Sequence, residues 1–358
     1  MLKVGLVGLP NAGKSTLFNA LVSGAAEVAD YPFTTIDPNV GVVAVPDERL
    51  QKIASLVGAQ KATPATVQFV DIAGLVKGAS KGEGLGNQFL ANIREVDAIC
   101  HVVRCFGPAK IPHVYGSVDP VRDAEIVNEE LILADLDTID RRMAKTERML
   151  KSGERKYQEE MSSLRVLKDT LSRGRAARLA GLEEMPEGLF LLTAKPMLYV
   201  ANVSEEEVDS SPEAARLEEY ARRQDAPVVV VSARIESELA ELSPGEAAEV
   251  RKSYGLSDPS LNRVVRVSYD LLGLVTFFTT KGPETRAWAV RAGTTAVEAA
   301  GKIHSDMEKG FIKAEVISYR DLLAAGSMGA AHDRGLVRVE GRDYMVADGD
   351  VILFRFRA

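Results

Sequence analysis

The sequence has little cysteine and no long apolar run. Its 358 residues include only two cysteines, Cys100 and Cys105, which lie in or just after a strand-like apolar stretch. This pattern favours buried free thiols in a reducing compartment over a disulfide or a metal site. No segment has close to the about eighteen consecutive apolar residues that a membrane-spanning helix needs. The first residues lead directly into a glycine-rich loop, so we expect no signal peptide, no membrane contact and a cytoplasmic protein.

The chain also lacks the positive charge of a general polyanion binder. Its formal net charge is −7, and its contents of 46% hydrophobic and 27% charged residues are ordinary for a globular protein. Any contact with nucleic acid must therefore come from a local basic patch. The length predicts two or three domains.

What the sequence does contain is a phosphate-binding signature. Gly8-Leu9-Pro10-Asn11-Ala12-Gly13-Lys14-Ser15 fits G-x-x-x-x-G-K-[ST], between a strand-like run and a helical pattern, which is the context this motif requires. Glycines let backbone N–H groups face a phosphate, and the helix N-terminus favours negative charge. We predict that Lys14 reaches the outer phosphates and that Ser15 is a ligand of Mg²⁺. The other predicted nucleotide contacts of this region are Asn11, Ala12, Gly13 and Thr16.

Two further segments fit the switches of such a site. Tyr31-Pro32-Phe33-Thr34-Thr35 follows about twenty residues after Lys14, and Thr35 is predicted to bind Mg²⁺ when a third phosphate is present. A strand-like run ends in Asp71-Ile72-Ala73-Gly74, the pattern D-x-x-G. We predict that Asp71 holds Mg²⁺ mostly through water and that the Gly74 N–H meets the γ-phosphate.

The residue after this glycine departs from many GTPases. They carry a glutamine that orients the attacking water, whereas this chain has Leu75, which cannot hydrogen-bond through its side chain. The site must position water in another way or hydrolyse slowly. The glycine-rich run from Lys77 to Gly86 indicates a mobile second switch. We interpret His101, inside an apolar strand, as a core histidine.

The base-binding motif is altered as well. After the strand-like run Met197–Ala201 comes Asn202-Val203-Ser204-Glu205, where Ras-like GTPases carry N-K-x-D. The longer Glu205 carboxylate would sit differently against guanine, so guanine preference is doubtful, although the spacing does not prove adenine. Ser232 and Ala233, after another apolar strand, fit the short loop that contacts the base.

A proline-free region from about 124 to 180 has helical periodicity. It predicts an antiparallel pair of helices, a coiled coil interrupted near Ser152-Gly153. Residues 141–178 hold twelve basic and five acidic residues, a net +7 on an acidic protein. This arm favours a partner with a phosphate backbone, and a solvated coiled-coil face is the alternative.

The remaining pattern completes the domain prediction. Short strand-like runs around one helix after Leu274 fit a compact β-grasp module. The predicted fold class is α/β: a P-loop NTPase domain of Ras-like type with a mostly parallel sheet, an inserted helical hairpin and a C-terminal β-grasp (TGS-like) domain. The predicted boundaries are 1–125 and 191–273 for the two parts of the NTPase domain, 126–190 for the helical insertion and 274–358 for the TGS-like domain.

With these motifs in this order, the sequence resembles the YchF/Obg-like ATPase family over essentially its full length. Leu75 and Asn202–Glu205, the two departures from ordinary GTPases, are themselves marks of that family. The resemblance implies binding and hydrolysis of ATP in preference to GTP, association with ribosomes and a role in translation or stress regulation. It also implies that His113 takes part in hydrolysis and that Asn11 matches the asparagine of phosphate loops that recruit K⁺.

Three hypotheses follow. The first is a Mg²⁺-dependent ATP-hydrolysing switch, a monomer that binds the ribosome or RNA and uses Lys14, Thr35, Gly74 and His113 in catalysis. The second is a GTPase of the same fold. The third is a ribosome-binding adaptor that uses its nucleotide as a regulatory ligand with negligible turnover, which Leu75 would favour.

Overall fold

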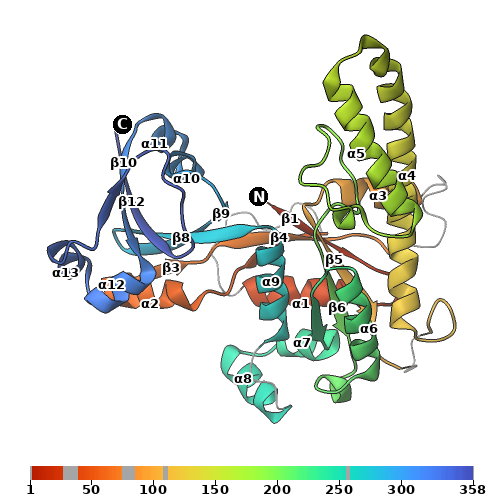
Figure 1. Ribbon diagram of the computed structural model, residues 1–358. Helices are drawn as coiled ribbons and strands as arrows, with labels where there is room; N and C mark the ends of the chain where they lie inside the picture. Colours follow the sequence, from red (N-terminus) through yellow and green to blue (C-terminus); the bar gives the residue numbers. More distant parts are fainter. Residues whose placement is uncertain (1, 27–38, 75–84, 108–111, 255–258, 358) are drawn as a thin grey trace. The chain divides into compact units, whose positions relative to one another are not determined.

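The computed structural model describes residues 2–26, 39–74, 85–107, 112–254 and 259–357 (Figure 1). The described residues form two compact units, the first from within 1–24, 35–41 and 68–268, the second from within 25–34, 42–67 and 269–358. The predictions for Thr35, for Leu75 and for most of the glycine-rich run lie outside the described residues. In the described part of the chain no helix is long and apolar enough to cross a lipid bilayer.

A six-stranded sheet, counted over the described residues, carries the first unit's core. Its order is β2-β4-β1-β5-β6-β7. The strands are β1 (Lys3–Val7), β2 (Val40–Ala44), β4 (Thr66–Asp71), β5 (Ala98–Arg104), β6 (Met197–Asn202) and β7 (Val228–Val231). The pairs β1–β4, β1–β5, β5–β6 and β6–β7 are parallel. Every residue of β5 and β6 is buried, as expected of central parallel strands, and the predicted α/β class is confirmed.

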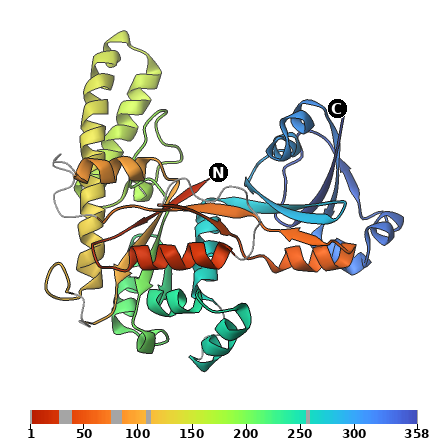
Figure 2. The same ribbon diagram turned by 180° about the vertical axis from the view of Figure 1, so that it is seen from behind.

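Helices cover this sheet because their apolar stripes match its faces. The helices of this region are α1 (Lys14–Ala26), α3 (Leu85–Arg94), α4 (Pro120–Met149), α5 (Arg155–Ser172), α6 (Pro212–Arg223), α7 (Ala233–Leu239), α8 (Pro244–Ser253) and α9 (Ser260–Leu271). Buried side chains of α3, α4 and α6 pack in one cluster with those of β1, β5 and β6. Figure 2 shows α1, the helix that begins in the phosphate loop, running along the sheet.

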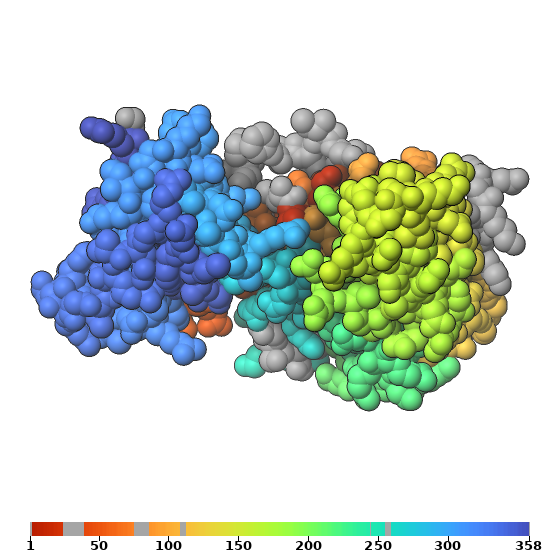
Figure 3. All heavy atoms as spheres, turned by 45° about the horizontal axis from the view of Figure 1, so that its top comes forward, coloured from red at the N-terminus to blue at the C-terminus, as the bar shows by residue number. Residues whose placement is uncertain are grey.

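The predicted helical hairpin is present, and its first helix has two roles. Helix α4 has 30 residues; Leu131 packs in the sheet's core cluster, while Ile139 packs in a separate hairpin cluster with Leu164 and Leu167 of α5. The turn between the helices ends at Gly153, whose φ of 76° favours glycine. In Figure 3 the hairpin and the segment that returns from it form one packed surface, coloured yellow to light green.

A buried carboxylate anchors this returning segment. Asp135 of α4, 1% exposed, accepts hydrogen bonds from the Leu192 N–H at 2.7 Å, the Thr193 N–H at 2.8 Å and the Thr193 hydroxyl at 2.6 Å. The Thr193 hydroxyl in turn accepts from the Ala177 N–H at 2.9 Å. Burial raises the pKa of the Asp135 carboxyl and these hydrogen bonds oppose that shift. The network fixes where the chain re-enters the sheet at β6.

The second unit is built on its own mixed sheet. Its order over the described residues is β11-β10-β12-β8-β9-β3. The strands are β3 (Lys61–Thr63), β8 (Leu274–Lys281), β9 (Glu284–Arg291), β10 (Phe311–Ser318), β11 (Arg338–Glu340) and β12 (Asp350–Phe356). The helices are α2 (Glu48–Val57), α10 (Ala296–Ile303), α11 (Ser305–Lys309), α12 (Tyr319–Ala325) and α13 (Met328–Asp333). Strands β8 and β9 form an antiparallel hairpin, and the Thr295 hydroxyl caps α10 by accepting a hydrogen bond from the Glu298 N–H.

This unit also takes in a segment that the sequence analysis assigned to the NTPase domain. Residues 42–67 belong to it, because β3 pairs in parallel with β9, Lys61 opposite Glu284. Arg49 of α2 binds Asp348 at 2.6 Å and lies over the ring of Phe278. The predicted boundary of 1–125 for the first part of the NTPase domain therefore needs correction, since strand pairing and this ion pair join the early segment to the C-terminal sheet.

The Asp135 network gives a first prediction. Asp135→Ala leaves three buried donors without acceptors, and it should lower the free energy of unfolding by about 2–5 kcal/mol. Asp137→Ala is a matched control, because Asp137 is exposed and forms an ion pair with Arg141 on the same helix; its loss should cost about 0–1 kcal/mol. Denaturant unfolding measures both variants. Equal losses for the two would show that the buried network does not stabilise the fold.

Candidate functional site

The phosphate loop has the backbone that its glycines predict. It connects β1 to α1, and Gly8, Asn11 and Gly13 have positive φ angles of 151°, 63° and 94°. A Cβ at Gly13 would collide with the side chain of Asn202, and one at Gly8 would collide with the Val102 carbonyl oxygen. Both glycines are therefore required by close approach as well as by conformation. The first turn of α1 begins at Lys14 and opens at this loop.

Lys14, Ser15 and Asp71 meet at the mouth of the loop. The Lys14 ammonium donates to the Leu9 carbonyl at 2.9 Å, and the Ser15 hydroxyl donates to Asp71 Oδ2 at 2.7 Å. Burial lowers the pKa of Lys14, and the charge of Asp71 opposes that shift. Asp71 Oδ1 is buried and has no hydrogen-bond partner among the described residues. A hydroxyl beside a carboxylate with an unsatisfied oxygen fits Mg²⁺, which prefers oxygen ligands.

Gly74 approaches the same place. A Cβ on this glycine would lie 3.1 Å from the Lys14 Nζ and 3.3 Å from the Pro10 backbone nitrogen. Its backbone is thus next to the phosphate loop, where the sequence analysis expects it.

Asn202 joins the phosphate loop to the predicted base loop. Its side chain is 4% exposed; Nδ2 donates to the Ala12 carbonyl at 2.9 Å and Oδ1 accepts from the Ala233 N–H at 3.0 Å. Ser232 precedes α7 as its N-cap, accepting from the Ile235 N–H. Asn202 therefore braces the two loops, with both groups of its amide already engaged.

The predicted nucleotide residues line a single cavity of about 640 Å³, a volume typical of small-molecule sites. Its lining residues are Asn11, Gly13, Lys14, Ser15, Thr16, Phe106, Asn202, Val203, Ser204, Glu205, Glu206, Ser232, Ala233 and Arg234. Ala12 adjoins it through its bond to Asn202, and the Val203 side chain is 3% exposed in the sheet's core. The Glu205 carboxylate pairs with the Arg234 guanidinium at 2.8 Å.

Sequence reasoning missed two residues that shape this cavity. Phe106 follows the C-terminal end of β5, and the buried Arg104 lies 4.3 Å from its ring centroid while donating to the Phe106 and Gly107 carbonyls. Arg234 directly follows the expected Ser232-Ala233 pair, but no motif marks it in the sequence. A signal for Phe106 existed, since ligands bind at the carboxyl ends of strands in parallel sheets.

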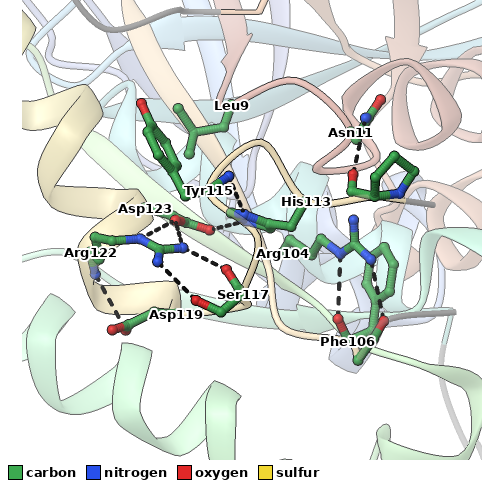
Figure 4. A network of polar contacts seen from close by, with 12 residues as sticks. Leu9, Asn11, Arg104, Phe106, His113, Tyr115, Ser117, Asp119, Arg122 and Asp123 are labelled. Carbon is green, nitrogen blue, oxygen red and sulfur yellow. Dashed lines mark hydrogen bonds and ion pairs between the residues drawn. The ribbon is translucent and has the colours of Figure 1, made fainter.

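His113 lies beside the phosphate loop, in a polar network (Figure 4). Its Nε2 is 2.7 Å from Asp123 Oδ2, and its Nδ1 accepts from the Tyr115 N–H at 3.1 Å. Leu9, Pro10 and Ala12 line the same small hollow as His113 and Asp123. This hollow is too small to hold a water molecule. The neighbouring Asn11 donates to the Pro112 carbonyl at a long 3.4 Å.

His101 is a core histidine, as the sequence analysis interpreted it. It is 1% exposed in β5, its ring packs against that of Tyr199, and burial lowers its pKa to about 3. Cys100 and Cys105 are both buried free thiols, also as expected.

The loop between β1 and α1, with its serine bonded to an aspartate at the end of a neighbouring parallel strand, defines the class of protein: a P-loop NTPase. A family model described as "50S ribosome-binding GTPase" matches residues 3–134. A second, for the C-terminal region of YchF GTPases and described as "Protein of unknown function (DUF933)", matches residues 274–357.

Whole-chain relatives define the family. The chain is 51% identical over 362 residues to the Bacillus subtilis protein named "Ribosome-binding ATPase YchF", with 99% of each chain covered. It is 49% identical over 358 residues to the Haemophilus influenzae protein of that name, again with 99% of each covered. The solved "Schizosaccharomyces pombe YchF GTPase" is similar with a TM-score of 0.89 and 33% identity, over 99% of this chain and 97% of that one. The chain belongs to the YchF family, so the predicted resemblance is confirmed.

The Asn202 bridge gives a second prediction. Asn202→Ala removes both bonds that join the phosphate loop to the base loop, and it should weaken nucleotide binding by at least about tenfold, roughly 1.4 kcal/mol. Asn92→Ala, on α3, is the control and should bind like the parent protein. Equilibrium binding of a fluorescent nucleotide measures the difference. An unchanged dissociation constant for Asn202→Ala, with the fold intact, would contradict the bridging role.

Proposed function

We propose that this protein is a Mg²⁺-dependent ATP-binding and ATP-hydrolysing switch that associates with the ribosome. The observation that carries the proposal is the hydrogen bond from Ser15 to Asp71, because Ser15 and Lys14 line the same cavity as Glu205. Relatives that share half of its residues over the whole length are named ribosome-binding ATPases. Regulation of translation or of a stress response is the process that this proposal inherits from the family resemblance.

In this mechanism the phosphate loop binds the triphosphate and the chain's own donors orient it. Loop N–H groups and the Lys14 ammonium bind the outer phosphates, and Gly74 lets its backbone approach the γ-phosphate. When bound, Mg²⁺ would be held by Ser15 and Asp71, together with Thr35, which lies outside the described residues. It would neutralise negative charge on the phosphates. Since Leu75 cannot orient water, we assign that role to His113, close to the phosphate loop.

The base end supports ATP over GTP. A carboxylate that recognises guanine must accept two hydrogen bonds from the base, but Glu205 already pairs with Arg234. Arg234 also contacts Glu238, so it lies between two carboxylates. Guanine would have to compete with this cation for Glu205. The Schizosaccharomyces pombe relative is named a GTPase and the bacterial relatives are named ATPases, so direct competition between the two nucleotides tests this part of the proposal.

The helical hairpin supports the ribosomal part of the proposal. Of its twelve basic residues between 141 and 178, six pair with carboxylates and Arg178 is largely buried. Within the described part of the chain, five exposed cations have no ion-pair partner: Lys145, Arg148, Lys151, Arg165 and Arg175. Three of them, Lys145, Arg148 and Lys151, lie near the hairpin tip. Unpaired exposed cations are available to RNA phosphates, whereas paired ones are already neutralised.

The proposal also covers the oligomeric state, the location, the domain organisation and a K⁺ site. The protein acts as a monomer in the cytoplasm, with a coiled-coil insertion at 126–190 and a TGS-like module that starts at Leu274. Asn11 is the residue proposed to recruit K⁺ beside the phosphates, where a cation can stabilise developing charge.

The base end yields the third prediction. In competition binding at equal Mg²⁺, ATP should displace a fluorescent analogue at least about tenfold better than GTP, roughly 1.4 kcal/mol. Arg234→Gln should free Glu205 and shift the ratio toward GTP by about two- to fivefold, since an exposed pair is worth about 0–1 kcal/mol. Glu238→Gln removes the other partner of Arg234 but leaves the Glu205–Arg234 pair in place, so it should not shift the ratio toward GTP. A GTP preference in the parent protein would make this a GTPase of the same fold, and turnover equal in Na⁺ and K⁺ would exclude the K⁺ role.

The hairpin yields the fourth prediction. Replacing Lys145, Arg148 and Lys151 together with alanine should weaken co-sedimentation with ribosomes and reduce its salt dependence. Each lost phosphate contact should lower the log–log salt slope by roughly 0.7–0.9. The matched control replaces the paired Arg141, Arg155 and Arg173 with alanine and removes the same charge. Identical losses for both triple variants would show that net charge, and not the lack of an ion-pair partner, sets the affinity.

A further inference from the structure

The strongest unassigned feature of the site is the carboxylate behind His113. Asp123 lies in the first turn of α4, and its side chain and that of His113 are only 4% and 6% exposed. The two side chains are 2.7 Å apart, and the phosphate-loop residue Leu9 lies beside them (Figure 4). A buried histidine–aspartate pair lines the same hollow as the phosphate loop, and neither the sequence motifs nor the names of the relatives give Asp123 a role.

The hydrogen bonds fix the tautomer of the imidazole. Nδ1 accepts from the Tyr115 backbone N–H, so in the neutral ring it carries no proton. The ring proton is therefore on Nε2 and is donated to Asp123 Oδ2. A carboxylate that takes one ring N–H in this way makes the other nitrogen a better acceptor and orients the ring, as in a serine-protease triad. In this protein the acceptor nitrogen is Nδ1.

Asp123 is itself held in place. Arg122 donates to its Oδ1 from Nε at 3.1 Å and from Nη2 at 2.8 Å, so each carboxylate oxygen has its own partner. The same guanidinium donates to the Ser117 carbonyl at 2.6 Å and lies over the Tyr115 ring. Asp119 caps the helix by accepting from the Arg122 N–H. The loop that carries His113 is thus attached to the N-terminal turn of α4 through Asp123 and Arg122.

We propose that Asp123 is a positioning residue for hydrolysis, which holds His113 as the Nε2–H tautomer so that Nδ1 is the nitrogen that accepts a hydrogen bond from water. The proposal rests on the proposed role of His113. Because the Tyr115 N–H donates to Nδ1, a water that donates to this nitrogen replaces that N–H. Arg122 pairs with Asp123 at 2.8 Å, and Arg104 lines the same small hollow as the histidine–aspartate pair.

The kinetic test is a double-mutant cycle on the full-length protein with Mg²⁺ and ATP. Asp123→Asn keeps the volume of the side chain but offers only one acceptor oxygen to Arg122 and His113. We expect it to lower kcat by at least about tenfold, within the usual size of a lost acid–base contribution. KM for ATP should change by less than about threefold, because no residue of the phosphate loop has been altered. His113→Ala should cause a similar loss, and the double variant should be no slower than either single variant.

Asp119→Asn is the matched control. It changes a carboxylate one turn away, on the same helix, which contacts Arg122 and Arg216 but not His113. It should leave kcat unchanged. Thermal unfolding of all variants separates lost folding from lost positioning, and Asp123→Glu, which restores two acceptor oxygens, should recover part of the rate. The proposal would be overturned if the two losses of kcat multiplied in the double variant. It would also be overturned if a folded Asp123→Asn protein kept the parent's kcat.

A second readout does not depend on turnover. Long-range ¹H–¹⁵N NMR correlations report which ring nitrogen of His113 carries the proton. We expect the Nε2–H form in the parent protein and in Asp119→Asn, and a shift toward Nδ1–H in Asp123→Asn. An unchanged tautomer in Asp123→Asn would overturn the positioning role. If the tautomer shifts but His113→Ala keeps the parent's kcat, the geometry stands and the hydrolytic role of His113 falls.

Discussion

One buried amide holds the nucleotide cavity together. Asn202 donates to the carbonyl of Ala12 in the phosphate loop and accepts from the N–H of Ala233 in the base loop. Because these loops follow different strands, their separation depends on this bridge and on the sheet below it. Gly13 completes the constraint, since any side chain at that position would occupy the space of the amide. The distance between the phosphate loop and the predicted base loop is thus set before any ligand binds. Such preorganisation lowers the cost of binding and leaves more binding energy for selecting the ligand.

The parts of this arrangement that depend on local pattern could be predicted from the sequence. The phosphate loop, the D-x-x-G strand end and the altered base motif all lie where their flanking periodicity predicted. Neighbouring parallel strands present their carboxyl ends at one edge of a sheet, so Ser15 and Asp71 could be expected to meet. The break between the hairpin helices was visible as well, because Gly153 adopts a positive φ that other residues avoid.

Long-range partners could not be predicted in this way. Periodicity shows which face of a strand is buried but not which strand edge it joins, so residues 42–67 looked like part of the NTPase domain although β3 pairs with β9. Arg234 carries no motif, and its importance depends on where Glu205 points. Asp123 resembled an ordinary acidic residue in the first turn of a helix, where such residues are common. Only the fold brings it to His113, ten residues earlier in the chain.

Helix α4 connects these findings. Its first turn holds Asp123 beside the phosphate loop, its middle holds Asp135 and the returning chain, and its last turns carry Lys145 and Arg148. An α-helix of 30 residues is about 45 Å long, so the tip cations and the His113 loop are attached to opposite ends of one rigid element. A partner at the tip changes events at the nucleotide only if it binds two arrangements of this helix with different affinity. The Arg122–Asp123 contacts connect the first turn of this helix to the imidazole of His113, so a second arrangement of the helix would reach the site through these hydrogen bonds.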